Sequence, residues 1–274
     1  MSASRLEHEF GVGPDLIDDL VLANRILAQH HVLDTFGHVS VRCNRNGNNV
    51  DGEDLFLLAT YNAPAYVGCD DIAIYRVSTG EPADETEKRK GALERHIHAG
   101  IYRAHADVQA VLHCHAPLLV SFSILPPGPD ELKPVLHVGA SAGSKIPIYD
   151  IAHRYGDHTN LLINTPELGD DLASYFGAVG GRKGPRMVLM RGHGATVVSP
   201  ANVRDVVHRG IYAVVNAGIY KDALLMSRPT LSEDPRTLSE GEVEACGGIN
   251  SVDRSWPAWV LALGADNGLE RSKP

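Results

Sequence analysis

Two histidines one residue apart, His113 and His115, end an apolar run and have the residue types and spacing of a metal site. Because side chains of a β-strand alternate between the two faces of a sheet, both imidazoles are expected on one face and Cys114 on the other. Such a pair is half of a site for a zinc-like or manganese-like ion. Glu94 precedes the pair in a stretch that favours a helix, and the glycine-flanked His193 follows it far downstream. Together these residues predict a metal site of three histidines with an acid/base carboxylate beside it.

The elements that would position these residues alternate between helical and extended patterns. Residues 91–104 favour a helix, on which Glu94 and His98 share a face because they are four residues apart. The asparagine- and glycine-rich stretch 44–49 is typical of a hairpin turn between two strands. Further helices are expected over 14–32, 168–176, 202–225 and 256–263, and strands over 39–42, 55–59, 72–77, 134–138, 146–151, 186–190 and 195–198.

Composition and length narrow the class of protein. The net charge of −9 disfavours a nucleic-acid partner. Four widely spaced cysteines without a CxxC pair indicate a reduced, cytoplasmic protein. Neither the apolar core of a signal peptide nor a run of about 18 apolar residues is present, so no contact with a membrane is expected. The length fits one large domain over residues 1–274, in which residues 228–274 form a C-terminal extension.

The order and spacing of four motifs resemble the class II aldolase and adducin family over roughly residues 14–225. The motifs are Phe36-Gly37-His38-Val39-Ser40-Val41-Arg42, Glu94-x-x-x-His98-x-x-Ile101-Tyr102, His113-x-His115 and Arg191-Gly192-His193-Gly194. The resemblance implies a three-layer α/β/α fold around a central, mainly antiparallel sheet. It also implies a divalent metal bound by His113, His115 and His193, with Glu94 as the general acid/base. A homotetramer with the active site at a subunit interface is the assembly that the resemblance implies.

The residues that bind phosphate in the sugar-phosphate aldolases of this family differ in the present chain. His38 stands where those aldolases have an asparagine, and Ala92-Leu93 replace a pair of serines before the catalytic glutamate. Their Thr-Pro-Ser/Thr-Gly turn is replaced by Thr-Tyr-Asn-Ala-Pro-Ala at 60–65. Phosphate is bound best by hydroxyls, backbone N–H groups and glycine turns. A phosphorylated substrate is therefore disfavoured, although the metal site and the base are retained.

The remaining pattern resembles the branch of the family that decarboxylates hydroxylated aromatic dicarboxylates, on a pyridine or a benzene ring, in aromatic catabolism. A hydroxyl beside the carboxylate can chelate the metal, which stabilises the carbanion left by loss of carbon dioxide as an enolate. Glu94 would then protonate the ring carbon. Candidate substrate-binding residues are Arg42, Lys145 and Arg191 as cations for a second carboxylate, together with His38, His96 and Tyr212.

Two alternatives to a decarboxylase stay open. The same site in an aldolase would cleave a non-phosphorylated hydroxy-keto compound and release an aldehyde. A non-enzymatic, adducin-like domain would be expected to have lost its ligands, whereas the three histidines and Glu94 are all present. The sequence does not identify the substrate. It does not identify the metal either, because three-histidine sites accept manganese or zinc and also cobalt or iron.

Overall fold

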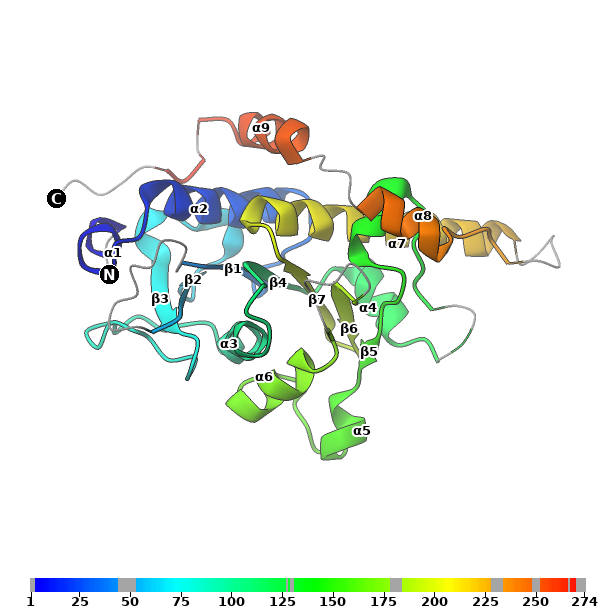
Figure 1. The fold of residues 1–274 in the computed structure, drawn as a ribbon, viewed down its shortest axis with the longest axis horizontal. Helices are drawn as coiled ribbons and strands as arrows, with labels where there is room; N and C mark the ends of the chain where they lie inside the picture. Colours follow the sequence, from blue (N-terminus) through cyan, green and yellow to red (C-terminus); the bar gives the residue numbers. More distant parts are fainter. Residues whose placement is uncertain are drawn as a thin grey trace.

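The structure is a computed structural model that describes residues 3–43, 53–126, 128, 131–177, 184–227, 234–247, 252–265 and 267–269. Within these residues the centre is a seven-stranded sheet in the order β3-β2-β1-β4-β7-β6-β5 (Figure 1). Neighbouring strands are antiparallel, except that β5 and β6 are parallel. The strands are β1 (His38–Arg42), β2 (Leu55–Ala59), β3 (Ile72–Arg76), β4 (Ala110–Cys114), β5 (Ile148–Tyr149), β6 (Met187–Met190) and β7 (Gly194–Ser199).

Helices cover both faces of the sheet. The long helices α2 and α7 pack along one face with α9 outside them, whereas α3 and α6 pack against each other on the opposite side (Figure 1). The expected three-layer α/β/α fold with a mainly antiparallel sheet is confirmed. The helices are α1 (Ala3–Phe10), α2 (Pro14–Gln29), α3 (Arg95–Ala104), α4 (Pro117–Ser123), α5 (Ile151–Tyr155), α6 (Pro166–Ala173), α7 (Val203–Ser227), α8 (Glu240–Gly247) and α9 (Val252–Leu263), with 3₁₀ turns η2 (Pro64–Tyr66), η3 (Cys69–Asp71) and η4 (His137–Ala142).

The central strand β4 is buried on both faces, so its side chains divide between two cores. Leu112 and Cys114 pack in the core that the sheet shares with α2 and α7. Val111 packs in the core shared with α3 and α6. Because side chains alternate along a strand, His113 lies on the same face as Val111. The prediction that Cys114 points away from the histidines is therefore confirmed.

One expected strand is absent because a side chain, and not a neighbouring strand, pairs with its backbone. Residues 134–138 were expected as a strand, but they form no strand and lead into η4. Asn216 of α7 takes the role of a partner strand: its Oδ1 accepts the N–H groups of Val135 and Leu136, and its Nδ2 donates to Lys133 O. The element α8 was not expected at all.

The other differences concern element ends. The helix expected from residue 91 begins at Arg95, so Glu94 directly precedes its first turn. The predicted turn at 44–49 lies outside the described residues, but β1 and β2 pair antiparallel as a hairpin requires, with Ser40 opposite Leu58. None of the described helices combines the length and the apolar character needed to cross a bilayer. The four cysteines, all within the described residues, form no disulfide.

Candidate active site

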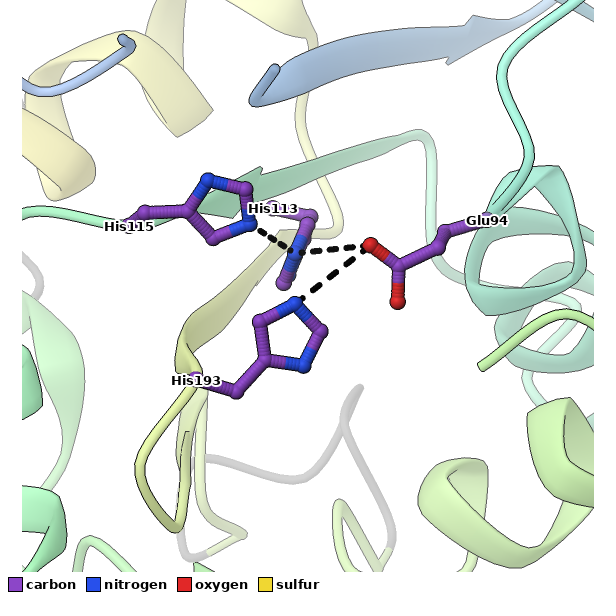
Figure 2. Close-up of side chains that lie close together, drawn as sticks. All are labelled: Glu94, His113, His115 and His193. Atoms are coloured by element: carbon purple, nitrogen blue, oxygen red, sulfur yellow. Dashed lines mark hydrogen bonds and ion pairs between the residues drawn. The ribbon is translucent and has the colours of Figure 1, made fainter. Parts of the chain in front are cut away.

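Glu94, His113, His115 and His193 form one cluster, in which one ligand atom of each residue lies within 4.8 Å of the others. The Nε2 atoms of His113 and His115 are 3.0 Å apart. One carboxylate oxygen of Glu94, Oε2, lies 3.4 Å from Nε2 of His193 and 3.6 Å from Nε2 of His113. Figure 2 shows the four side chains converging from separate parts of the fold. The sequence therefore predicted correctly which residues meet, although their roles are not decided by proximity alone.

Local structure explains why glycines flank His193. The histidine lies in the tight turn between β6 and β7, and Gly192 adopts a left-handed conformation there with φ of +65°. A Cβ atom on Gly194 would lie 2.0 Å from the carbonyl oxygen of Cys114. The absence of a side chain at Gly194 therefore lets β7 approach β4 closely enough to bring His193 beside His113 and His115.

Hydrogen bonds behind the imidazoles turn their Nε2 atoms toward the centre of the cluster. Nδ1 of His115 lies 3.2 Å from both carboxylate oxygens of Asp34. Nδ1 of His113 lies 3.3 Å from Oγ1 of Thr196. The Thr196 hydroxyl donates its hydrogen to the sulfur of Met190, so its oxygen can only accept a hydrogen bond from His113. Both Nδ1 atoms therefore carry the hydrogen, and both Nε2 atoms present lone pairs.

This arrangement fits a metal ion. Two Nε2 lone pairs 3.0 Å apart repel each other unless a cation lies beside them both. Burial lowers the pKa of His113 well below its ordinary value, so its imidazole is neutral, as a metal ligand must be. Three imidazole nitrogens and one carboxylate are a donor set typical of zinc, and also of manganese, cobalt or iron. The cluster could hold one divalent ion.

Asp34 contacts the cluster through His115, and the sequence alone did not identify it. Burial acts to raise the pKa of Asp34, but N–H donors from Phe36 and Gly37 and the contact with His115 outweigh it, so the pKa is lowered. The carboxylate is therefore charged and can orient His115 as an acceptor. Its position directly before the Phe36–Arg42 motif was the signal in the sequence that could have identified it.

Glu94 is buried, and each of its oxygens has a separate environment. Oε1 accepts the backbone N–H of Ile163 at 2.8 Å, whereas Oε2 faces the histidines. Burial acts to raise the pKa of Glu94, but its contact with the imidazole of His193 and the hydrogen bond from Ile163 N–H outweigh burial, so the pKa is lowered. Glu94 is thus a carboxylate at neutral pH, with one oxygen anchored and the other available for chemistry.

A cavity of about 760 Å³ opens beside the cluster and is lined by Glu94, His115, His193 and His38 among others. Its rim carries apolar side chains with large exposed fractions: Phe36 at 67%, Tyr61 at 56% and Leu93 at 49%. Among the described residues that line the cavity, Glu94 is the only acidic residue, and there is no lysine or arginine. The cavity is thus mainly neutral and apolar apart from the candidate metal site.

Of the six candidate substrate-binding residues, only His38 lines this cavity. Arg42 lies at the opposite end of β1, where its guanidinium donates to the carbonyl oxygens of Val108 and Tyr102 and pairs with Asp54. The guanidinium of Arg42 thus bonds to groups of the interior and lies outside the cavity lining of this chain, and its expected role in binding a second carboxylate stays a prediction.

The remaining candidates also lie outside the cavity lining. Arg191 pairs with Asp150 at 2.7 Å, and Lys145 is exposed in the loop before β5. His96 is buried against Gly80 on the far side of α3. The ring of Tyr212 lies beside that of His208 on α7, with centroids 4.6 Å apart, in the helix layer that covers the opposite face of the sheet. None of these four lines the cavity within this chain, so contact between them and a substrate stays a prediction.

Comparison with known families gives one match over most of the chain. The model described as Class II Aldolase and Adducin N-terminal domain matches residues 18–220. That range contains the four clustered residues and the strands and helices that position them. The segment after α7 lies beyond the matched range.

Two curated relatives have decarboxylase names. The chain is 34% identical over 247 residues to decarboxylase tropJ of Talaromyces stipitatus, covering 86% of this chain and 89% of that protein. It is 26% identical over 214 residues to 3,4-dihydroxyphthalate decarboxylase of Arthrobacter keyseri, covering 73% and 75%. Among solved structures, an aldolase II superfamily protein from Pseudomonas syringae has a TM-score of 0.69 at 18% identity, covering 91% of this chain and 92% of that chain. This last likeness shows the shared fold.

Proposed function

Because this chain belongs to the class II aldolase and adducin family, we propose that it is a metal-dependent carbon–carbon lyase that decarboxylates a hydroxylated aromatic carboxylate. The observation that carries the proposal is the cavity wall beside Glu94, which Ala92 and Leu93 line. An aromatic ring can pack against these apolar side chains, whereas a phosphate group would find no hydroxyl on them. The decarboxylase names of both curated relatives support the same reaction.

In this proposal His113, His115 and His193 hold the divalent ion, which we propose to be zinc or manganese, with cobalt or iron as substitutes. When bound, the ion supplies Lewis acidity that stabilises negative charge on the substrate as carbon dioxide leaves. Asp34 and Thr196 keep two of the imidazoles turned toward the ion through their Nδ1 hydrogen bonds.

Glu94 moves the proton that the reaction needs. As a carboxylate with a lowered pKa, it can accept the proton of a substrate hydroxyl at Oε2. The carbon–carbon bond to the carboxylate then breaks, its electron pair stays on the ring carbon, and carbon dioxide departs. Glu94 returns the proton to that carbon, and the substrate oxygen regains a proton from water after release. The anchor from Ile163 N–H to Oε1 keeps Oε2 in place through both transfers.

The charge of the cavity bears on the substrate. Within the described lining of this chain no lysine or arginine faces the cavity, so a second carboxylate would lack a cationic partner there. A substrate with one carboxylate beside a hydroxyl therefore fits this chain without further help. A substrate with two carboxylates would need a cation that is not among these lining residues to pair with its second carboxylate.

The experiment supplies zinc- or manganese-loaded enzyme with hydroxylated benzene and pyridine carboxylates bearing one or two carboxylates, and with non-phosphorylated hydroxy-ketones. Carbon dioxide and aldehyde release are measured side by side, with a His113→Ala variant as the matched control. We expect carbon dioxide from at least one aromatic acid and none from the control. Aldehyde release from a hydroxy-ketone without any carbon dioxide from the acids would instead assign an aldolase.

A further inference from the structure

A file of polar side chains leads from the cavity into the interior between β1 and α3. His38 and Ser40 alternate onto the same face of β1, and His98 and Tyr102, four residues apart, share a face of α3. These four residues meet although 58 or more positions separate the strand residues from their helix partners. The mechanism proposed above uses none of their contacts.

The four residues form one continuous hydrogen-bonded chain. Oη of Tyr102 lies 2.8 Å from Oγ of Ser40, which lies 2.6 Å from Nδ1 of His98. Nε2 of His98 in turn lies 2.6 Å from Nδ1 of His38. The inner three residues are at most 1% exposed, whereas His38 is 7% exposed where it reaches the cavity. Only Nε2 of His38 remains to face a ligand.

Hydrogen accounting sets the direction of this chain. Burial raises the pKa of Tyr102, so its hydroxyl keeps the hydrogen, and Ser40 Oγ is the only acceptor that the described residues offer it. If Tyr102 donates to Ser40, Ser40 donates to Nδ1 of His98, and Nε2–H of His98 donates to Nδ1 of His38. The reverse order would leave the buried Tyr102 hydrogen without an acceptor, which is costly in a protein interior.

Both histidines of the chain are neutral, as this order requires. In this order Nδ1 of His98 accepts from Ser40 and its Nε2–H donates, while Nδ1 of His38 accepts. A neutral imidazole carries one hydrogen. Since Nδ1 of His38 accepts, its hydrogen must be on Nε2.

We propose that Tyr102, Ser40 and His98 are positioning residues that hold His38 as a donor of its Nε2–H into the cavity, toward a substrate oxygen not bound to the metal. The identity of that acceptor rests on the proposed function. An imidazole fixed in this way differs from the asparagine of the sugar-phosphate aldolases, because an amide can both donate and accept. His38 therefore favours a substrate group that accepts a hydrogen bond at this position, such as a carboxylate or carbonyl oxygen, over a group that can only donate one.

The first test is the tautomer of His38 in the zinc-loaded protein labelled with ¹⁵N-histidine. Two-bond ¹⁵N–¹H spectra distinguish the two tautomers, and His38→Asn identifies the signal. We expect the hydrogen on Nε2 in the wild type and a mixture of tautomers in Ser40→Ala. The matched control is Ser199→Ala, which removes the hydroxyl of another fully buried serine, one that donates to Asp205. A wild-type His38 with its hydrogen on Nδ1, or a cationic His38, overturns the proposal.

The second test measures binding of 2-hydroxybenzoate by calorimetry. Loss of one neutral hydrogen bond should weaken binding about three- to tenfold in His38→Phe and Ser40→Ala. Ser40→Thr, which keeps the hydroxyl, should restore binding, and Ser199→Ala should bind like the wild type. Unchanged affinity in Ser40→Ala together with an unchanged tautomer contradicts the positioning role. Because neither readout requires turnover, failure of the enzyme to decarboxylate aromatic acids would contradict the proposed function and not the hydrogen-bond chain.

Discussion

At the residue scale, the side chains around Glu94 make its two oxygens unequal. Oε1 is held by the N–H of Ile163 at 2.8 Å, and Oε2 faces Nε2 of His193 and of His113. A carboxylate that moves protons needs such a fixed geometry, since proton transfer depends on hydrogen-bond distance to the reacting atom. The same geometry would also suit a fourth metal ligand, and a substitution separates the two roles.

We predict that Glu94→Gln keeps the metal and lowers kcat by about 10²–10⁴-fold, because the amide retains an acceptor for Ile163 N–H but cannot take a proton. Metal content by elemental analysis and kcat on the aromatic acid that the wild type decarboxylates are the two measurements. Near-normal turnover would show that Glu94 does not move the proton. Loss of metal in step with activity would make it a ligand instead.

We also predict that His113→Ala combined with His115→Ala abolishes metal binding, because two of three imidazole donors disappear. The purified wild type should contain about one divalent ion per chain, and the double variant should contain almost none. His153→Ala, which removes an exposed histidine, is the control and should keep its metal. Full metal content in the double variant would rule out this ligand assignment.

At the element scale, the position of His193 depends on how closely β7 approaches β4. Gly194→Ala would place a Cβ atom 2.0 Å from the carbonyl oxygen of Cys114, so the strands must separate. We predict a loss of stability of about 3 kcal/mol or more, as for overpacked cores, together with a lower metal content. Thermal and denaturant unfolding with metal analysis test this prediction.

Gly192→Ala tests a milder change than Gly194→Ala. At Gly192 a side chain would meet no close atom, and only the φ of +65° disfavours it. This substitution should cost about 1–2 kcal/mol, which is less than Gly194→Ala. Gly241→Ala on the exposed face of α8, where a Cβ atom meets nothing within 4 Å, should leave stability and metal content unchanged or slightly raise stability. Equal effects at Gly192 and Gly194 would contradict the close-approach explanation.

The loop before α3 contains an ion pair between Arg89 and Glu87 that makes stability depend on pH. Arg89 donates to Glu87 at 2.5 and 2.9 Å and also to the carbonyl oxygens of Asp70 and Ile72. Hydrogen bonding from Arg89 lowers the pKa of Glu87 to about 2, from an ordinary value of 4.5. The unfolded chain therefore takes up a proton first as the pH falls, and the native state loses its advantage between about pH 5 and pH 2.

We predict that Glu87→Gln lowers the free energy of unfolding at pH 7 by up to about 3 kcal/mol and flattens its decline between about pH 5 and pH 2. Urea unfolding at pH 7, 5 and 3 provides the measurement. Glu244→Gln on the exposed face of α8 is the control and should leave the pH profile of the wild type unchanged. A Glu87→Gln profile parallel to the wild type would show that the ion pair does not depress this pKa.

At the scale of the whole molecule, apolar side chains remain exposed on the helix layer formed by α2, α7 and α9. Val215 and Ile219 on α7 are 41% and 44% exposed, Met226 is 76% exposed, and Leu261 on α9 is 82% exposed. The helix α9 packs on its own chain, where Trp259 contacts His30 with ring centroids 5.4 Å apart. Exposed apolar surface of this kind is typical of surfaces that contact another chain.

The expected homotetramer is a prediction at this scale. Light scattering on the purified protein should give four times the chain mass, and Ile219→Glu combined with Met226→Glu should weaken the assembly by burying charge at a contact. Glu240→Gln on the exposed surface of α8 serves as the control. A stable, fully active monomer would contradict both the tetramer and an active site shared between subunits.

Features that depend only on residues close together in the chain could be predicted from the amino-acid sequence. Alternation along β4 places Cys114 opposite His113, and a helical spacing of four aligns Tyr102 with His98. These periodicities follow from backbone geometry, so they can be read without knowing what packs nearby. The motifs in which these residues occur were also sufficient to predict the family and the three-layer fold.

Contacts between side chains that are far apart in the sequence became visible only in the folded chain. Asp34 binds His115 across 81 positions, and Asn216 replaces a strand partner for residues some 80 positions away. The sequence shows that Arg42 carries a positive charge, but only the packed structure shows that its guanidinium donates to the carbonyl oxygens of Val108 and Tyr102. These partners come from packing between distant segments, which no local period encodes, and for that reason they could not be predicted from the sequence while the clustered histidines could.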